Sequence, residues 1–269
     1  MQTTNSIAAI DLLDFNTVPD RDLQAQVEAI DEHLRKRYGM TPEHTAVGVL
    51  DFNKQRLAWL RPDRITYGAS VPKIGILLAY FEVHPEAATK LEPQTRHELG
   101  LMIKVSSNEM AAKYSHALGL KRIQEVLYQY HFYDASRGGG IWVGKHYGQS
   151  DERIGDPVAD HSHAVTVRQC LRFYSLLEQG KLVSAEGSKT MRQIFESPDI
   201  PHERNKFLKR LNGPDLQIIR KSGSWENWLH DTAVNKGPGR HYTLVGLTEH
   251  PKGDDYLADL APAVDDKLQ

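Results

Sequence analysis

The chain has 269 residues, more than the roughly 100 to 200 residues of a typical single domain, so it forms one large domain or two closely associated lobes. Hydrophobic residues make up 40% of it and charged residues 25%, which excludes a disordered or fibrous protein. Its formal net charge of -2 offers no overall excess of positive charge, so we expect no nucleic-acid partner.

The start of the chain and its cysteine content bear on the cellular compartment. The first residues carry no basic segment, and residues 7–13 are too short, and interrupted by Asp11, for a signal sequence or a membrane span. We therefore expect no membrane segment and, for the chain as it stands, a cytoplasmic protein; removal of a leader would imply a periplasmic or secreted one. The single cysteine, Cys170, excludes an intrachain disulfide and falls in an expected helix, which predicts a small buried side chain.

The first expected element is an amphipathic helix over residues 23–38, where apolar residues recur at steps of three and four. Asp20 stands in position to cap this helix and Gly39 to end it. Two β-rich segments follow at residues 46–51 and 56–60, and the turn residues between them predict a hairpin.

The chain then changes character, because nearly every segment of residues 70–195 predicts helix, with glycine breaks at Gly119, Gly180 and residues 138–140. Strand signals return afterwards and predict an antiparallel meander, and helical spacing closes the chain. These last segments are residues 217–222, 231–235, 241–248 and 257–268.

This order of elements predicts an α+β fold of the α/β-sandwich type: an antiparallel five-stranded sheet, flanked by the N- and C-terminal helices, with an all-helical lobe inserted. We expect a discontinuous sheet lobe of residues 1–60 and 213–269 and a helical lobe of residues 61–212. The candidate residues described next come from both lobes, so we expect the active site at their junction.

The first candidate motif is Ser-x-x-Lys, formed by Ser70 and Lys73 at the start of a strongly apolar helix over residues 74–81. Its spacing places both side chains on one helical face, with Pro72 in the first turn. Desolvation lowers the pKa of a buried lysine, and the neutral amine can then take the proton of a serine hydroxyl. The alternative is a serine cap followed by a surface lysine, and this motif is expected by chance about once in such a chain.

Two further motifs change this balance. Ser106-Ser107-Asn108 stands at an expected helix start, and Lys221-Ser222-Gly223 at the end of an expected strand. The three motifs in this order resemble the set found in class A β-lactamases and penicillin-binding proteins. The chain therefore resembles the serine β-lactamase and penicillin-binding-protein superfamily, most closely its class A branch, and the similarity in element order covers most of residues 20–268.

The resemblance implies catalysis through a covalent acyl-enzyme. Ser70 would be the acylated nucleophile, Lys73 its general base, and Ser106 a relay that passes a proton to the leaving group. This mechanism requires neither a metal nor a cofactor.

The resemblance also assigns substrate-binding residues. Asn108 would hold the lysine and the substrate amide, while Lys221 and Ser222 would bind the substrate carboxylate by charge-assisted hydrogen bonds. Gly223 would let the substrate lie along the strand. The backbone N–H groups of Ser224 and of the nucleophile would form the oxyanion hole.

The sequence departs from the class A pattern in two places. Ser70 and Ser106 lie closer together in the chain than in class A enzymes, which predicts a more open cleft. The Glu-x-x-Leu-Asn stretch, whose glutamate activates the deacylating water in class A enzymes, is absent from residues 141–156. Glu152 is a candidate replacement; without one, we expect slow deacylation.

Two other groups of residues have less specific signals. His161 and His163 form half of a possible metal site, but without nearby cysteines or a carboxylate cluster hydrogen bonding is favoured, so we expect no metal. Trp225 and Trp228 follow the third motif, either as core residues or as a wall against an apolar substrate side chain.

The sequence therefore predicts a class A β-lactamase-like serine hydrolase, acting on the C–N bond of a β-lactam or on a related amide or ester. The alternatives are a D-alanyl-D-alanine carboxypeptidase or esterase of the penicillin-binding type, a cytoplasmic biosynthetic acyltransferase, and a binding protein without turnover. The last is disfavoured because all three motifs are intact. We expect a small-molecule substrate and a monomer.

Overall fold

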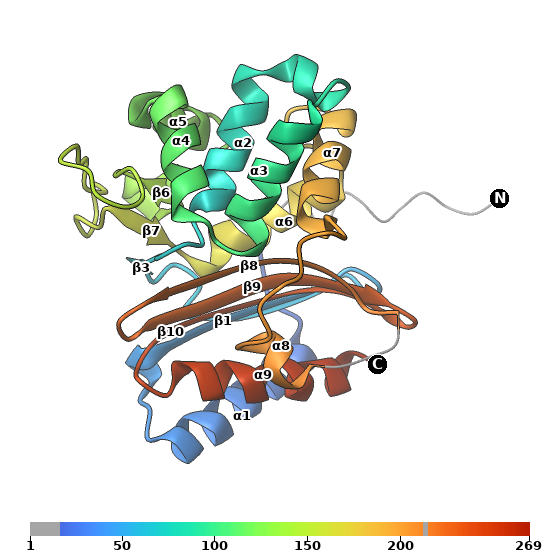
Figure 1. The fold of residues 1–269 in the computed structure, drawn as a ribbon. Coiled ribbons are helices and arrows are strands. Elements are labelled where there is room, and N and C mark those ends of the chain that lie inside the picture. Colours follow the sequence, from blue (N-terminus) through green and yellow to red (C-terminus); the bar gives the residue numbers. More distant parts are fainter. Residues whose placement is uncertain (1–16, 212–214) are drawn as a thin grey trace.

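In the computed structural model of this protein, residues 17–211 and 215–269 are described. Residues 7–13, considered above as a signal or membrane segment, lie outside the described residues. Helices α1 (Arg21–Tyr38) and α9 (Gly253–Leu268) cover one face of the large sheet, and the helices of the middle of the chain cover the other (Figure 1).

The large sheet has five strands in the order β2-β1-β10-β9-β8, which confirms the predicted fold class. All four pairings are antiparallel. The N-terminal hairpin meets the C-terminal meander where β1 pairs with β10, from Thr45 opposite Thr248 to Asp51 opposite Tyr242. The strands are β1 (Thr45–Asp51), β2 (Arg56–Leu60), β8 (Gln217–Trp225), β9 (Trp228–Gly237) and β10 (Arg240–Glu249).

The predicted caps of α1 are both present. The Asp20 side chain accepts a hydrogen bond from the backbone N–H of Leu23 at 2.8 Å. Gly39 ends the helix at φ 67°, a left-handed conformation in which glycine carries no steric penalty. Local sequence therefore sets both ends of this helix.

Helices α2 to α7 form the layer above the sheet, and the prediction of nearly continuous helix was wrong between α5 and α6. That region instead holds short strands, because Gly138, Gly139 and Gly140 all have positive φ angles and a Cβ at Gly140 would lie 2.0 Å from the Phe132 carbonyl oxygen. The helices are α2 (Lys73–Val83), α3 (Pro93–Lys104), α4 (Asn108–Leu118), α5 (Leu120–Gln129), α6 (Val167–Glu178) and α7 (Ala185–Glu196). The short strands are β3 (Thr66–Tyr67), β4 (Tyr133–Asp134), β5 (Gly139–Gly140), β6 (Trp142–Val143) and β7 (His163–Val165).

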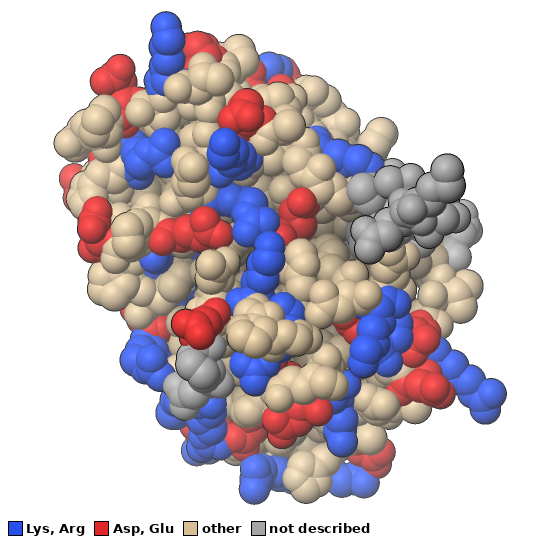
Figure 2. Space-filling model, turned by 90° about the vertical axis from the view of Figure 1, so that its right-hand side faces the viewer, with Lys and Arg blue, Asp and Glu red and all other residues tan. Residues whose placement is uncertain are grey.

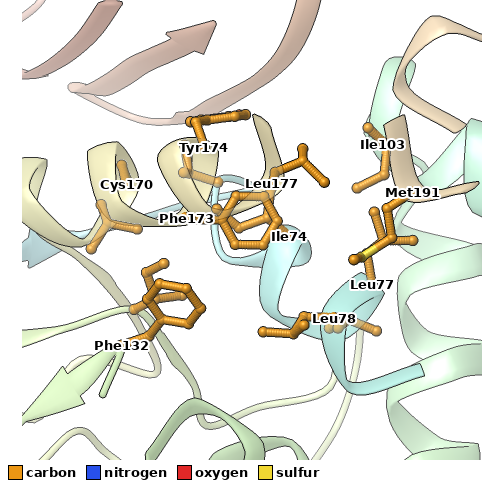
Figure 3. Packing of buried hydrophobic residues seen from close by; sticks show 14 of the residues in the cluster. Ile74, Leu77, Leu78, Ile103, Phe132, Cys170, Phe173, Tyr174, Leu177 and Met191 are labelled. Atoms are coloured by element: carbon orange, nitrogen blue, oxygen red, sulfur yellow. The ribbon is translucent and has the colours of Figure 1, made fainter. Parts of the chain in front are cut away.

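Helix α2 is the centre of the upper hydrophobic core. Its apolar side chains from Ile74 to Ala79, and that of Phe81, are fully buried and pack among those of α3, α6 and α7 (Figure 3). Cys170 on α6 is buried in the same cluster, as predicted. A second cluster fills the space between the sheet and helices α1 and α9. With apolar neighbours on all sides, α2 provides a fixed, water-poor base for the residues at its start.

The surface carries mixed charge. Lysine, arginine, aspartate and glutamate are interspersed on the face that Figure 2 shows. Within residues 17–211 and 215–269, no helix has the length and apolar character needed to cross a membrane.

Candidate active site

The helix that carries the first motif starts later than its sequence predicts. Helix α2 begins at Lys73, and Ser70 lies in the turn before it, where its carbonyl oxygen accepts from the Lys73 N–H at 3.3 Å. Ala69, directly before the serine, has φ 48°, a conformation that costs a non-glycine residue roughly 1–3 kcal/mol. The expectation that both side chains lie on one face of a regular helix was wrong, yet this turn still directs them toward each other.

Lys73 lies at the centre of a group of neutral partners. Its ammonium nitrogen lies 3.0 Å from Ser70 Oγ, 2.7 Å from the Ser106 carbonyl oxygen and 2.7 Å from Asn108 Oδ1. On another side, Lys73 Nζ lies 4.3 Å from the centroid of the Tyr147 ring. No carboxylate of the described residues is among these partners. The geometry suits either protonation state, because an amine can accept the Ser70 hydroxyl proton while donating to the other two oxygens.

Burial controls the protonation of Lys73. Its side chain has no exposed surface, and desolvation lowers its pKa to about 7. A lysine with this pKa is neutral in a large fraction of molecules near pH 7, as a general base must be.

Ser106 connects the two lysines of the motifs. Its carbonyl oxygen accepts from Lys73, and its hydroxyl accepts from the ammonium group of Lys221. Its backbone has φ 57°, which turns the carbonyl and the hydroxyl toward different lysines. Ser107 then caps α4 by accepting from the N–H of Met110 at 3.2 Å, as the sequence predicts for a helix start.

Lys221 is fully buried on β8. Besides Ser106, it donates to the Ser222 carbonyl oxygen at 2.7 Å. Burial, followed by the charge of Lys73, holds the pKa of Lys221 well below its ordinary range. These contacts place Lys221 beside the Ser106 hydroxyl rather than on an exposed surface.

A third buried lysine, Lys206, lies beside the third motif, although no sequence motif marks it. Lys206 donates to Ser224 Oγ at 2.7 Å, and burial lowers its pKa. Arg220, by contrast, is committed to Asp231 through a buried ion pair of 2.8 Å. A second buried lysine besides Lys221 therefore lies beside the third motif.

Gly223 allows β8 to lie directly against the turn that carries Ser70. A Cβ at this position would lie 2.9 Å from the Gly68 carbonyl oxygen and 3.0 Å from the backbone nitrogen of Ser70. Only glycine permits this approach of two backbones without displacement. The approach brings the backbone of the third motif against that of the first, while Ser224 next to it is exposed.

A pocket of about 240 Å³ opens beside Ser70 and Asn108. No aspartate or glutamate of the described chain lines it. Its lining residues are Tyr67, Ala69, Ser70, Asn108, Lys145, His146, Tyr147, Gly148, Ser162, His163, Ser224 and Trp225. A larger groove of about 440 Å³ lies between α1 and α9, on the other side of the sheet, and contains none of the motif residues.

Tyr147 forms part of the pocket next to Lys73. Its hydroxyl donates to the Ala69 carbonyl oxygen at 3.0 Å, and its ring lies 4.2 Å from that of His163. Burial raises the pKa of the Tyr147 phenol well above its ordinary value, so this group is a neutral donor at physiological pH. A neutral ring, not a carboxylate, faces Lys73 on this side.

Glu152, the candidate deacylating base, lies outside the pocket lining. Its side chain is 57% exposed and contacts His146 Nε2 at 3.2 Å. His146 in turn contacts Ser115 Oγ through Nδ1 at 2.8 Å. Glu152 therefore approaches the pocket only through His146.

His161 and His163, the two candidate metal ligands, have different environments. His163 is buried, contacts the Lys145 carbonyl oxygen through Nε2 at 3.1 Å, and has a pKa that burial lowers to about 3. His161 is half-buried and lies near Tyr67. Among the described residues, no group of three or more His, Cys, Asp or Glu is arranged to hold a metal ion.

The structure thus brings Ser70, Lys73, Ser106, Asn108 and Lys221 together, although they lie far apart in the chain. No sequence pattern marks Tyr147, His146 or Lys206, because an isolated aromatic, histidine or lysine in a loop carries no pattern signal. The one sequence feature that points to Tyr147 and His146 is their place within residues 141–156, the region in which the class A glutamate is expected and absent.

A family model described as a beta-lactamase enzyme family matches residues 83–266. The match includes the second and third motifs and begins after the first. No curated protein matches the sequence.

Solved structures share the fold at low sequence identity. A beta-lactamase from Sphaerobacter thermophilus is 14% identical with a TM-score of 0.71, covering 91% of this chain and 97% of that chain. A class A beta-lactamase from Mycobacterium abscessus is 16% identical with a TM-score of 0.67, covering 90% and 98%. A point mutant of PBP-A, an acyl-enzyme complex with penicillin G, is 14% identical with a TM-score of 0.68, covering 93% and 98%.

Proposed function

This chain belongs to the beta-lactamase enzyme family, and from that premise we propose that it is a serine hydrolase that forms an acyl-enzyme on Ser70 with β-lactams or related amides and esters. The observation that carries the proposal is the 3.0 Å contact between Ser70 Oγ and Lys73, a lysine whose pKa burial lowers to about 7. A hydroxyl nucleophile and a neutral amine base are thereby in hydrogen-bond reach.

Acylation then follows from the contacts of these groups. Neutral Lys73 takes the hydroxyl proton of Ser70 as Oγ attacks the substrate carbonyl carbon, while Asn108 and the Ser106 carbonyl hold the amine in place. The C–N or C–O bond of the substrate breaks, and the Ser106 hydroxyl passes a proton to the leaving group. Lys221 donates to that hydroxyl and replaces the proton that Ser106 has given up, which leaves Lys73 protonated and Lys221 neutral at the end of acylation.

The β8 side of the site would bind the acyl oxygen and the substrate carboxylate. The backbone N–H groups of Ser70 and Ser224 serve as the oxyanion hole in this proposal. Lys221 and Ser222 bind the carboxylate, and Lys206, which donates a hydrogen bond to Ser224, adds a second lysine side chain at the same edge. Arg220 is not available for this task because its guanidinium is paired with Asp231.

Carboxylate recognition leads to a first prediction. Substrates with a free carboxylate should acylate Ser70 roughly 10- to 100-fold faster than their methyl esters, since hydrogen bonds to charged groups contribute about 1.5–3 kcal/mol. In Lys221→Ala this preference should fall sharply, while Lys236→Ala, which removes an exposed lysine from the adjacent strand, should leave it unchanged. Acylation rates measured by stopped flow decide this. If the preference for the free carboxylate were unchanged in Lys221→Ala, Lys221 would not recognise the carboxylate, and Lys206 would be the candidate for that role.

The lining of the pocket supports slow deacylation. Hydrolysis of the acyl-enzyme requires a base that holds a water molecule beside the ester. No described aspartate or glutamate lines the pocket. The group that packs against Lys73 from the pocket lining is the ring of Tyr147, whose neutral phenol is not a base.

Slow deacylation is the second prediction. With nitrocefin, the protein should show a burst of about one equivalent followed by slow steady turnover, and Glu152→Gln should leave both phases unchanged. Stopped-flow absorbance measures the two phases directly. Fast linear turnover without accumulated acyl-enzyme, abolished by Glu152→Gln, would instead make Glu152 the deacylating base through its contact with His146.

The experiment that tests the proposed function itself is incubation of the wild-type protein with a fluorescent penicillin, followed by intact mass measurement. We expect one covalent adduct per chain. A protein that remains unlabelled by penicillins and by acyl phosphonates alike would contradict the proposal.

A second candidate function is favoured by the same absence of an acid from the described pocket lining: a carboxypeptidase or esterase of the penicillin-binding type. An acyl-enzyme that persists is typical of penicillin-binding proteins, and the PBP-A mutant that shares this fold is an acyl-enzyme complex with penicillin G. Release of D-alanine from a D-alanyl-D-alanine peptide, faster than nitrocefin turnover, would favour this function over that of a β-lactamase.

A further inference from the structure

The backbone of Tyr67 links the sheet to the turn that carries Ser70. Tyr67 ends β3, shortly before Ser70 in the chain, and β3 lies above the end of the sheet where β8 turns into β9 (Figure 1). Gly223 on β8 approaches the same turn, since a Cβ there would lie 3.0 Å from the Ser70 backbone nitrogen. The position of Ser70 relative to the sheet therefore depends on what holds this short segment in place.

His230 on β9 reaches this segment from the sheet. It pairs with Gly223 in the register of β8 and β9, and residues directly opposite each other in an antiparallel pair have their side chains on the same face. Because Gly223 has no side chain, the turn lies close to the sheet, and His230 Nε2 lies 2.7 Å from the Tyr67 carbonyl oxygen. Trp228, also on β9, packs edge-on against the Tyr67 ring with centroids 5.4 Å apart.

The two partners of His230 fix its tautomer. A carbonyl oxygen can only accept, so Nε2 carries the proton that it donates to Tyr67, whereas Nδ1 accepts from the backbone N–H of Thr248 at 3.2 Å. The side chain has no exposed surface, and burial lowers its pKa to about 4, so the ring is neutral near pH 7. Since both ring nitrogens are bonded, the imidazole joins β10 to β3 in one fixed orientation.

We propose that His230 is a positioning residue, which holds the Tyr67 carbonyl and thereby sets the distance between the backbone N–H groups of Ser70 and Ser224. The inference rests on the proposed function, in which these two N–H groups form the oxyanion hole. Ser224 lies on β8, whereas Ser70 follows β3, so a shift of β3 relative to the sheet moves one donor and not the other. Such donors act only within about 2.7–3.1 Å of the oxyanion, so a small shift lowers the acylation rate.

Two substitutions separate the two hydrogen bonds of His230. The amide nitrogen of a glutamine reaches the place of Nε2, so His230→Gln can still donate to Tyr67. The shorter asparagine ends near the place of Nδ1, so His230→Asn can accept from Thr248 but cannot reach Tyr67. His230→Asn should slow acylation by benzylpenicillin about 10- to 100-fold, with at most about a threefold change in the dissociation constant of the penicillin, and His230→Gln should retain most of the wild-type rate.

The matched control is His241→Asn, which breaks the contact of 2.7 Å between His241 Nε2 and Glu178 on α6. His241 pairs with Lys236, near the opposite end of β9 from His230, so this variant should be acylated at close to the wild-type rate. Thermal unfolding is measured for all three variants. Equal acylation rates in His230→Asn and His230→Gln, or a loss of rate that follows the loss of melting temperature in His241→Asn as well, would contradict the proposal.

Hydrogen exchange separates this inference from the proposed function. The N–H groups of the turn are protected by bonds such as that from Val71 to the Gly68 carbonyl oxygen at 3.0 Å. Exchange in the peptide of residues 68–73 should be at least about tenfold faster in His230→Asn than in the wild-type protein, and nearly unchanged in His230→Gln. If no penicillin acylated the wild-type protein, the proposed function would fall and exchange would decide the inference: equal exchange in all variants would overturn it, and faster exchange confined to His230→Asn would support it.

Discussion

Replacing Ser70 with alanine is expected to abolish covalent labelling by penicillins completely. The Ser70 hydroxyl lies 3.0 Å from Lys73 Nζ and lines the pocket, whereas the Ser106 hydroxyl is bonded to Lys221. Removing the oxygen removes the atom that forms the acyl bond, so no rearrangement of neighbours restores it. Intact mass measurement after exposure to a fluorescent penicillin reports the result.

The matched control is Ser162→Ala, because Ser162 lines the same pocket and lies next to His163. This variant should be acylated at close to the wild-type rate. An adduct that forms on Ser70→Ala, or one that disappears equally in Ser162→Ala, would contradict the assignment of Ser70 as the nucleophile.

The second large effect is expected from Lys73→Ala, which should slow acylation by about 10²- to 10⁴-fold, the usual contribution of a general base. The pH dependence of the acylation rate tests whether Lys73 acts as the base. In the proposed mechanism the neutral amine is the base, and burial lowers the pKa of Lys73 to about 7, so the wild-type acylation rate should rise with pH through about 7 and level off above it. In Lys73→Ala that rise near pH 7 should be absent.

Lys145→Ala provides the control, since it removes another lysine from the lining of the same pocket without touching the Ser70–Lys73 contact. It should keep the rise near pH 7. Lys221 faces the same region and its pKa is lowered as well, so the profile of Lys221→Ala is needed to attribute the rise. If the rise remained in Lys73→Ala and vanished in Lys221→Ala, the general base would be Lys221.

Much of the fold was predictable because its signals are local. The Asp20 cap, the Gly39 stop and the hairpin of β1 and β2 each depend on a few adjacent residues. The middle of the chain was harder, because the segment between α5 and α6 depends on glycine conformations and tertiary packing that periodicity does not reveal.

In the candidate site, too, the residues of local motifs were predictable and those placed by tertiary packing were not. Ser70, Lys73 and Asn108 belong to short motifs, and the structure brings them within hydrogen-bond distance. Lys206 and Tyr147 reach the site from loops without any motif, and only the assembled fold places one beside Ser224 and the other over Lys73. The conformation of Ser106, at φ 57°, is likewise a product of its surroundings, since nothing in a serine residue favours it.

The most direct test of the account is peptide mapping of the protein after brief exposure to benzylpenicillin and acid quenching. We expect a single acyl adduct on the peptide that contains Ser70, present in nearly every molecule while substrate remains, because no carboxylate base is among the described residues that line the pocket. An adduct on another residue, such as Ser106, or benzylpenicillin turnover with no adduct at any time, would contradict it.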